Sequence, residues 1–203
     1  MNTNEFDKEY YMMSADRANN YPFLNWGSTK YSPFIKKKPI DDEALNLPLK
    51  IVIATPCPKN FEMADFLILS AIYATSEKMK NVFENNNVYG VQFFPIEIES
   101  KKGDIIIGHY AMHFWNRLAV VDKKNYKGGK PDQLGLIMDL QKFSLNENLL
   151  NKTPLEERLV IRVAENPTML LVHKSIYEAI KAEELTGMKF FRVDEWDSSV
   201  MFK

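Results

Sequence analysis

The chain has 203 residues, of which 45% are hydrophobic, so it can bury a core without disulfides or metals, as one large domain or two small ones. Its 26 basic and 27 acidic side chains are nearly balanced, which argues against a nucleic-acid binder that relies on neutralising phosphates. The longest apolar run, residues 66–74, is interrupted by Ser70 and is too short to span a membrane.

The start of the chain predicts a protein of the reducing cytoplasm. Residues 1–8 are polar, and we expect them to be frayed, whereas the aromatic and bulky residues 9–14 predict a first strand. The start has neither the basic region nor the apolar region of a secretory signal, and the single cysteine can form no internal bridge. We therefore expect a cytoplasmic location.

Residues 21–48 form a proline-rich passage in which no regular element fits for long. Prolines stand at positions 22, 33, 39 and 48, and each removes a backbone donor and disfavours helix before it. We expect the apolar side chains of this passage to attach it to the core; they are Phe23, Leu24, Trp26 and Phe34. Passages of this kind also carry binding function in some proteins.

A short charged stretch near the end of this passage has two interpretations. Asp41, Asp42 and Glu43 follow the three lysines at 36–38. Mixed charge runs of this length usually form a solvated surface. The alternative is an acidic lip that faces a partner.

Residues 49–53 predict a short strand, which the Thr-Pro-Cys-Pro sequence at 55–58 ends. A nucleophilic cysteine needs a helix N-terminus or a cation beside it to lower its pKa. No helix begins at Cys57, so we interpret it as structural.

The next stretch predicts a strand, a helix and a second strand. Residues 66–74 are continuously apolar and predict a buried strand. Ser76 is placed to cap a helix, whose buried stripe consists of Met79, Val82 and Phe83. Gly90 supplies the turn into a strand at residues 91–98.

Residues 105–121 decide whether two histidines can chelate a metal. In a helix, His109 and His113 would share a face, whereas in a strand they lie about 13 Å apart, too far for one ion. Three isoleucines, Gly108 and the aromatic density favour a strand with a break near residues 116–117. We therefore expect no metal site here.

The following segment reads as surface turns, a strand and a brief helix. Residues 127–131 lack the Gly-Lys-Ser/Thr ending of a phosphate loop and predict a surface turn. Residues 134–143 predict a strand and residues 146–152 a polar connection. Residues 153–156 match a capping box with proline at the first helical position.

A second strand, helix and strand follow a predicted strand at residues 159–163. The unit spans residues 169–195, and its buried helical stripe is Ile176, Ala179 and Ile180. His173 stands where Ser76 stands in the first unit, so the cap either moves to Ser175 or is lost. Gly187 turns the chain into the last strand, where Phe190 and Phe191 point to opposite faces.

The tail after this strand is acidic and carries one tryptophan. Trp196 lies between Glu195 and Asp197. Aromatic residues are enriched both in cores and in interfaces, so Trp196 is either a core anchor or part of a partner-binding surface.

Laying residues 72–98 over residues 169–195 suggests two copies of one unit. The overlay pairs Gly90 with Gly187 and pairs the two phenylalanines that follow each glycine. The alternative is that any two strand-helix-strand segments share such a pattern. We expect an α+β fold with a mixed, largely antiparallel sheet, in a pseudo-twofold arrangement in which the two units flank the central antiparallel strands. We expect one domain over residues 1–203.

The residues alone show no catalytic machinery, and we expect neither cofactor nor metal. Paired carboxylates, a nucleophile with a base, and a phosphate loop are all missing from the sequence. Two alternatives to a binding protein stay open. One is an enzyme that combines His109, His113 or His173 with an acid, Asp65 or Asp122; the other is a general scaffold or stress protein.

Four stretches carry a likeness to a known family: residues 67–96, 109–122 and 167–193, and to a lesser degree residues 10–13. Together they resemble a bacterial family, the immunity proteins of polymorphic toxin systems. The family is the eleventh immunity class, once a domain of unknown function and named after a Myxococcus immunity protein. The chain departs from the pattern at His173, where serine is expected, and in a longer loop at Gly128-Gly129.

This resemblance implies a non-catalytic protein that neutralises a cognate toxin by occlusion. Its partner would be the toxin protein, with no nucleic acid or membrane involved. Interfaces of this kind concentrate their energy in a few aromatic and charged residues. The candidate partner-binding residues are Trp26, Asp41, Asp42, Glu43, Glu195, Trp196 and Asp197.

Overall fold

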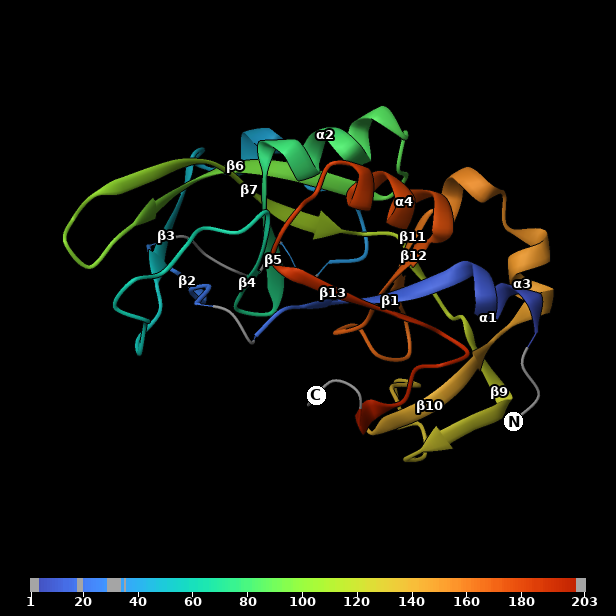
Figure 1. Ribbon diagram of the computed structural model, residues 1–203. Coiled ribbons are helices and arrows are strands. Elements are labelled where there is room, and N and C mark those ends of the chain that lie inside the picture. The colour runs from blue at the N-terminus through green and yellow to red at the C-terminus, as the bar shows by residue number, and fades with distance from the viewer. Residues whose placement is uncertain (1–3, 18–19, 29–33, 35, 200–203) are drawn as a thin grey trace.

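The computed structural model describes residues 4–17, 20–28, 34 and 36–199 (Figure 1). Expectations that fall on residues 1–3, and on residues 29–33 and 35 of the proline-rich passage, lie outside the described residues.

Strands dominate this part of the chain. They are β1 (Tyr10–Ala15), β2 (Leu24–Trp26), β3 (Leu49–Ile53), β4 (Phe66–Leu69), β5 (Ile72–Ser76), β6 (Val91–Glu99), β7 (Ile105–Phe114), β8 (Arg117–Leu118), β9 (Val121–Gly128), β10 (Leu140–Leu145), β11 (Val160–Val163), β12 (Leu170–His173) and β13 (Met188–Arg192). The α-helices are α1 (Glu5–Glu9), α2 (Glu77–Asn85), α3 (Glu147–Lys152) and α4 (Lys174–Ala182), with 3-10 turns η2 (Asp42–Ala44) and η3 (Leu155–Glu157). The content confirms the predicted α+β class.

The strands form a closed barrel, an open sheet and a hairpin. The barrel runs in the order β2-β3-β6-β7-β5-β4, and the five-stranded sheet in the order β13-β1-β12-β11-β8. β9 and β10 pair only with each other. Most pairs are antiparallel; β3 with β6, β2 with β4, and β11 with β8 are parallel. Figure 1 shows the barrel and the hairpin at opposite ends of the molecule, with α2 and α4 along one side.

The two predicted units occupy equivalent places in the barrel and the sheet. The barrel contains the order β4-β5-β7-β6, and the sheet contains the same order of counterparts, β11-β12-β1-β13. The registers also agree. Tyr10 of β1 lies opposite His173 of β12, and His109 of β7 lies opposite Ser76 of β5. The fold therefore contains two similar strand-helix-strand units, as the sequence predicts.

The helices of the two units end in the same way. After α2, Asn87 has φ of 52° and Gly90 has φ of 81°; after α4, Glu184 has φ of 53° and Gly187 has φ of 92°. These matched left-handed residues turn each helix back into its second strand. α2 and α4 contact each other, so the two units meet along their helices.

The central strand of each unit comes from a different part of the chain. β7 lies between β5 and β6, which directly precede it, whereas β1, from the start of the chain, lies between β12 and β13. Two insertions connect equivalent strands: residues 16–65 carry β2 and β3 and complete the barrel, while residues 115–159 carry β8, the β9–β10 hairpin and α3. A division of the chain at the 100–104 turn would leave the central strand of each unit in the other half.

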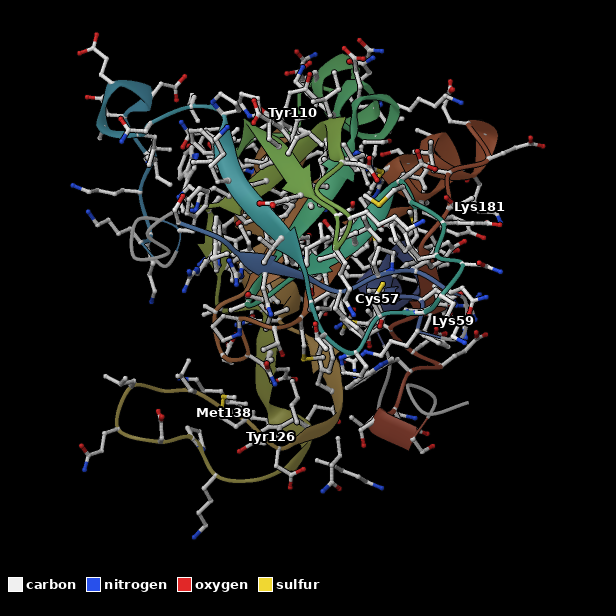
Figure 2. All side chains as sticks on the ribbon, turned by 90° about the vertical axis from the view of Figure 1, so that its left-hand side faces the viewer. Cys57, Lys59, Tyr110, Tyr126, Met138 and Lys181 are labelled. Carbon is white, nitrogen blue, oxygen red and sulfur yellow. The ribbon has the colours of Figure 1, made fainter. Side chains whose placement is uncertain are left out.

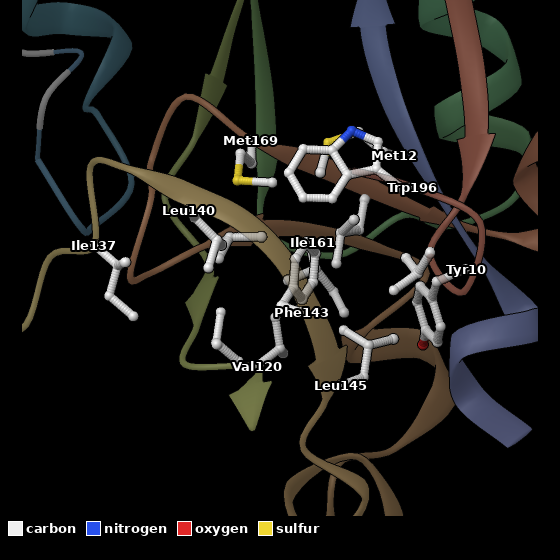
Figure 3. Packing of buried hydrophobic residues seen from close by; sticks show 14 of the residues in the cluster. Tyr10, Met12, Val120, Ile137, Leu140, Phe143, Leu145, Ile161, Met169 and Trp196 are labelled. Carbon is white, nitrogen blue, oxygen red and sulfur yellow. The ribbon is translucent and has the colours of Figure 1, made fainter. Parts of the chain in front are cut away.

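The core consists of three clusters of buried side chains. One fills the barrel, one lies between the two helices and the strands beneath them, and one lies between the open sheet and the β9–β10 hairpin. Figure 3 shows the third cluster, in which Trp196 packs with Phe143 and Ile161. Phe191 packs in this cluster and Phe190 in the helical one, so the two residues do point to opposite faces.

Three expectations for the elements were wrong near turns. Residues 66–74 form a hairpin, β4 and β5, because Ser70 adopts φ of 50° and reverses the chain. The expected strand at 134–143 begins only at Leu140, since Asp132 and Gly135 hold the preceding residues in a turn. Residues 147–152 of the expected polar connection form the helix α3, and Asn146 caps it through its side chain.

Two helix starts also differ from expectation. Residues 5–9 form α1 rather than a frayed end, because Asn4 and Asp7 make a reciprocal capping box. The capping box expected at residues 153–156 is wrong: Pro154 precedes the short η3 turn and no side chain caps it.

Among the described residues, no helix is long and apolar enough to cross a membrane.

Candidate partner-binding surface

The acidic stretch lies beside a groove at the end of α2. The groove has a volume of about 230 Å³, and Asp42 of η2 forms part of its wall. Its lining mixes polar and apolar side chains and consists of Asp42, Phe83, Glu84, Asn87, Val88, Val91, Gln92 and Phe93. The groove thus places apolar and acidic side chains next to each other.

Two side chains of the barrel hold the acidic stretch in place. The side-chain amide of Gln92 donates to the carbonyl of Ile40 (2.9 Å) and accepts from its N–H (2.7 Å). Nε2 of His113 lies 2.9 Å from the carbonyl oxygen of Lys38. The segment before η2 is therefore fixed to β6 and β7, although it contains no long regular element.

Within η2 the acidic side chains differ in what they do. Asp41 caps the turn, because its carboxylate accepts from the N–H of Glu43 at 3.2 Å. Asp41, Asp42 and Glu43 are all exposed. Glu84, at the end of α2, is paired with Lys80 at 2.6 Å. Asp42 and Glu43 are thus the acids that the turn presents outward.

An aromatic pair next to the groove was not identified from the sequence. Tyr89 follows the groove residue Val88, is 45% exposed, and meets the Trp115 ring edge to face at 4.8 Å. The N–H of Trp115 donates to the carbonyl of Gly90 (3.0 Å), which keeps the two aromatics together. In the sequence, this pair is marked only by the positions of its two aromatic residues: Tyr89 precedes β6 and Trp115 follows β7.

The other predicted partner-binding residues lie elsewhere. Trp26 is half-buried on β2, where its ring packs at 5.0 Å on Phe34 in the barrel. Trp196 is only 3% exposed and packs in the cluster beneath the hairpin, so it is the core anchor of the two alternatives. The structure therefore does not bring the acidic stretch together with the tail.

The acids around Trp196 have local partners. Glu195 pairs with Arg192 at 2.7 Å, and the carboxylate of Asp197 accepts from the N–H of Ser199 at 2.8 Å. Glu195 is exposed and Asp197 is partly exposed. These contacts give the tail a defined shape next to β13.

The three histidines lie in three different environments. Nε2 of His109 lies 3.3 Å from the Ala64 carbonyl oxygen, and His113 is fully buried in contact with Phe34. His173 caps α4: its Nδ1 accepts from the N–H of Ser175 at 3.3 Å, which corrects the expectation that the cap moves to Ser175 or is lost. Burial lowers the pKa of both His113 and His173.

The acids named for an enzyme have structural contacts. Asp65 accepts from the hydroxyl of Ser76 (2.6 Å) and from the N–H of Thr186 (2.8 Å), and Asp122 accepts from the N–H of Lys124 (3.0 Å). No group of three metal-ligating side chains occurs among the residues that the structure describes.

A second, larger hollow of about 760 Å³ lies between β9, β10 and α3. Most of the side chains around it are polar, and its lining includes Asp122, Lys123, Lys124 and Asn148.

Comparison with known protein families gives a match that covers most of the chain. The family model described as Immunity protein family (Imm11) matches residues 9–195. No curated protein matches the chain.

Proposed function

Because this chain belongs to the Imm11 family of immunity proteins, we propose that it binds one cognate toxin domain and blocks the functional surface of that toxin by occlusion. Membership of the family indicates a toxin-neutralising role and a toxin protein as partner. The mechanism by occlusion, without chemistry of the immunity protein's own, is our proposal.

One observation carries this proposal: the family match covers β1 to β13 and therefore both units of the fold. A match over a single unit would support only a shared folding motif. The site geometry is consistent with binding, since the groove at the end of α2 places apolar and acidic groups side by side.

We propose that Asp41, Asp42 and Glu43 take part in the interface around this groove, together with Tyr89 and Trp115. Tyrosine and tryptophan are enriched among hot-spot residues, Tyr89 is exposed and Trp115 is half-buried, and acidic groups at the rim steer a basic partner surface. Trp26, Glu195 and Asp197 are retained as weaker candidates, and Trp196 supports the tail from within the core.

We propose that the toxin is met in the cytoplasm. The single cysteine, which is half-buried and free, suits a reducing compartment.

The test is binding and growth rescue with the C-terminal domain of whatever large secreted protein is encoded next to this gene. Titration calorimetry should give a dissociation constant in the nanomolar range, and co-expression should restore growth of cells that produce the toxin domain. Occlusion further predicts that the toxin's substrate competes with the immunity protein. No binding and no rescue would contradict the proposed function; tight binding without competition would contradict occlusion alone.

Charge reversal checks the acidic stretch. Asp42→Lys together with Glu43→Lys should weaken binding about tenfold or more, mainly through slower association at low salt. Asp104→Lys, on the turn at the other end of β6 from the groove, is the control and should bind like the unaltered protein.

A further inference from the structure

The connection between β9 and β10 projects from the molecule and exposes two apolar side chains. We call residues 129–139 the β9–β10 loop. Leu134 is 84% exposed and Met138 is 66% exposed. Figure 2 shows this loop standing away from the rest of the chain, with Met138 on it and Tyr126 on β9 below.

The tip of the loop is held rigid by Asp132. Its Oδ1 accepts from the N–H groups of Leu134 and Leu136, each at 2.8 Å. The backbone of Asp132 closes the same ring, since its N–H donates to the Leu136 carbonyl (2.9 Å) and its carbonyl accepts from the N–H of Gly135 (3.0 Å). Gly135 has φ of 79°, which the turn requires. Leu134 therefore stands at the apex of an ordered turn.

The base of the loop is anchored to the core. Ile137 is 1% exposed and lies in the cluster beneath the hairpin, as Figure 3 shows. Its N–H donates to the backbone carbonyl of Glu165 at 2.7 Å, and the side-chain amide of Asn166 donates to its carbonyl at 3.2 Å. The alternation of buried Ile137 with exposed Met138 places the second apolar side chain on the outer side of the loop.

This arrangement differs from ordinary surface exposure of a hydrophobic residue. Scattered exposed leucines need no explanation, but here a network of hydrogen bonds fixes a leucine at the tip of a protruding turn. The hydrogen bonds order the backbone that carries Leu134, so a partner that covers this side chain removes little backbone conformational entropy. Methionine beside it can adapt its shape to the partner.

The shape of the loop indicates the shape of its partner. A protruding tip buries its apolar side chains only in a concave site. Two copies of the chain that met tip to tip would bury only a few side chains, far below the roughly 800 Å² per partner that a stable interface takes. The occupant that fits is a pocket on another protein, with apolar walls wide enough for one leucine.

We propose that the β9–β10 loop inserts Leu134 into an apolar pocket of the cognate toxin domain, with Met138 covering the rim of that pocket. The inference rests on the proposed function, because it takes the toxin as the partner. It assigns a hot-spot contact to a loop outside the acidic groove.

Leu134→Glu and Ile107→Glu form a matched pair of variants for the test. Both replace an exposed apolar side chain by the same charge, and Ile107 is 72% exposed on the distant β7. Leu134→Glu should raise the dissociation constant for the toxin domain about thirtyfold or more, as expected for a hot-spot residue, while Ile107→Glu leaves it unchanged. Circular dichroism melts of both variants should match those of the unaltered protein, since neither side chain is packed.

Asp132→Ala provides a second measurement, because it leaves Leu134 in place but removes the acceptor for two N–H groups. We expect a smaller loss of affinity that appears in slower association. Unchanged binding by Leu134→Glu, while the unaltered protein binds, would overturn this inference alone. Absence of binding by the unaltered protein would overturn the proposed function and this inference with it. A dimer that Leu134→Glu converts to a monomer, with toxin binding intact, would assign the loop to a second copy and overturn the inference.

Discussion

Asp65 connects the two helical units through one carboxylate. Its Oδ1 accepts from the hydroxyl of Ser76, the cap of α2, and its Oδ2 accepts from both the N–H (2.8 Å) and the hydroxyl (2.9 Å) of Thr186, after α4. Burial alone would raise the pKa of the Asp65 carboxyl, but these hydrogen bonds outweigh burial and hold the pKa below its ordinary value of 3.8.

Replacement of Asp65 by alanine should therefore loosen both units together. We expect the free energy of unfolding to fall by about 2 kcal/mol, because three hydrogen bonds to a charged group are lost at a partly solvated site. Urea unfolding of Asp65→Ala measures the loss. Asp122→Ala, which removes only a local turn contact, is the control. Equal stability of the two variants would show that Asp65 does not link the units.

Histidine burial predicts a pH dependence of stability. Burial lowers the pKa of both His113 and His173 in the folded chain. The charges of Arg162 and Arg117 lower the pKa of His113 further, whereas the charge of Glu9 opposes the shift at His173. In the unfolded chain the histidine pKa is about 6.5, so below that pH the unfolded chain binds more protons than the folded chain. The contribution of these histidines to the free energy of unfolding is therefore fully present above about pH 6.5 and decreases as the pH falls below it.

Urea unfolding at about pH 7.5 and about pH 5.5 should show the lower stability at the acidic pH. His113→Gln can still contact the Lys38 carbonyl through its amide but does not titrate, so it should reduce the difference between the two pH values. A variant with the same difference as the unaltered protein would remove His113 from this account.

The capping residues show how far single positions can be predicted. Ser76 was recognised because serine is a preferred cap and its hydroxyl accepts from the Met79 N–H. His173 was not, since histidine is outside the usual set of caps and accepts only through a neutral ring nitrogen. Its lowered pKa keeps that nitrogen free to accept.

At the scale of elements, the two helices with an apolar stripe were predicted, whereas α1 and α3 were not. The apolar stripes of α2 and α4 gave both helices because packing of one face dictates a helix. The hairpin at Ser70 and the turn at Asp132 were missed, because a left-handed serine and a side-chain acceptor for two N–H groups leave no periodic pattern. Of the residues that line the candidate groove, only Asp42 was predicted from the sequence to bind a partner. The lining comes from separate segments of the chain, so it leaves no periodic pattern either.

The turn after α4 requires glycine for two reasons. Gly187 has φ of 92°, and a Cβ there would overlap the carbonyl oxygen of Phe66 and lie 2.6 Å from the Cβ of Ala64. Gly103 has φ of 86° but open space around it. Alanine substitutions at Gly187 and Gly103 therefore separate the cost of backbone strain from the cost of atomic overlap.

Gly187→Ala should lower the free energy of unfolding by at least about 2 kcal/mol, because strain and overlap add. Gly103→Ala should lower it by about 1 kcal/mol, from strain alone. Thermal unfolding followed by circular dichroism measures both. A smaller loss at Gly187 than at Gly103 would contradict the close approach of β4 to the turn after α4.

At the scale of the whole molecule, the exchange of central strands makes the two units depend on each other. β1 completes the sheet of the second unit, and β7, which completes the first, would lie in the other half of a chain divided at the 100–104 turn. We propose on this ground that residues 1–203 form one domain, as the sequence suggests.

Fragments 1–102 and 103–203 should each be largely unfolded alone, because each lacks the strand that its own unit needs. Mixed or co-expressed, they should associate and recover the circular dichroism spectrum of the intact chain. Analytical ultracentrifugation and circular dichroism distinguish these states. A stable fold in either fragment alone would show two independent domains.

The two insertions have a consequence for stoichiometry. Two separate chains that traded central strands would carry identical insertions and would offer every surface twice. Here the insertion at 16–65 completes a barrel, whereas the insertion at 115–159 forms a hairpin with a projecting loop, so each surface exists once per molecule. Because the two units are joined in one chain, the insertion in one unit can differ from the insertion in the other. We therefore expect an immunity protein of this kind to bind a single toxin domain.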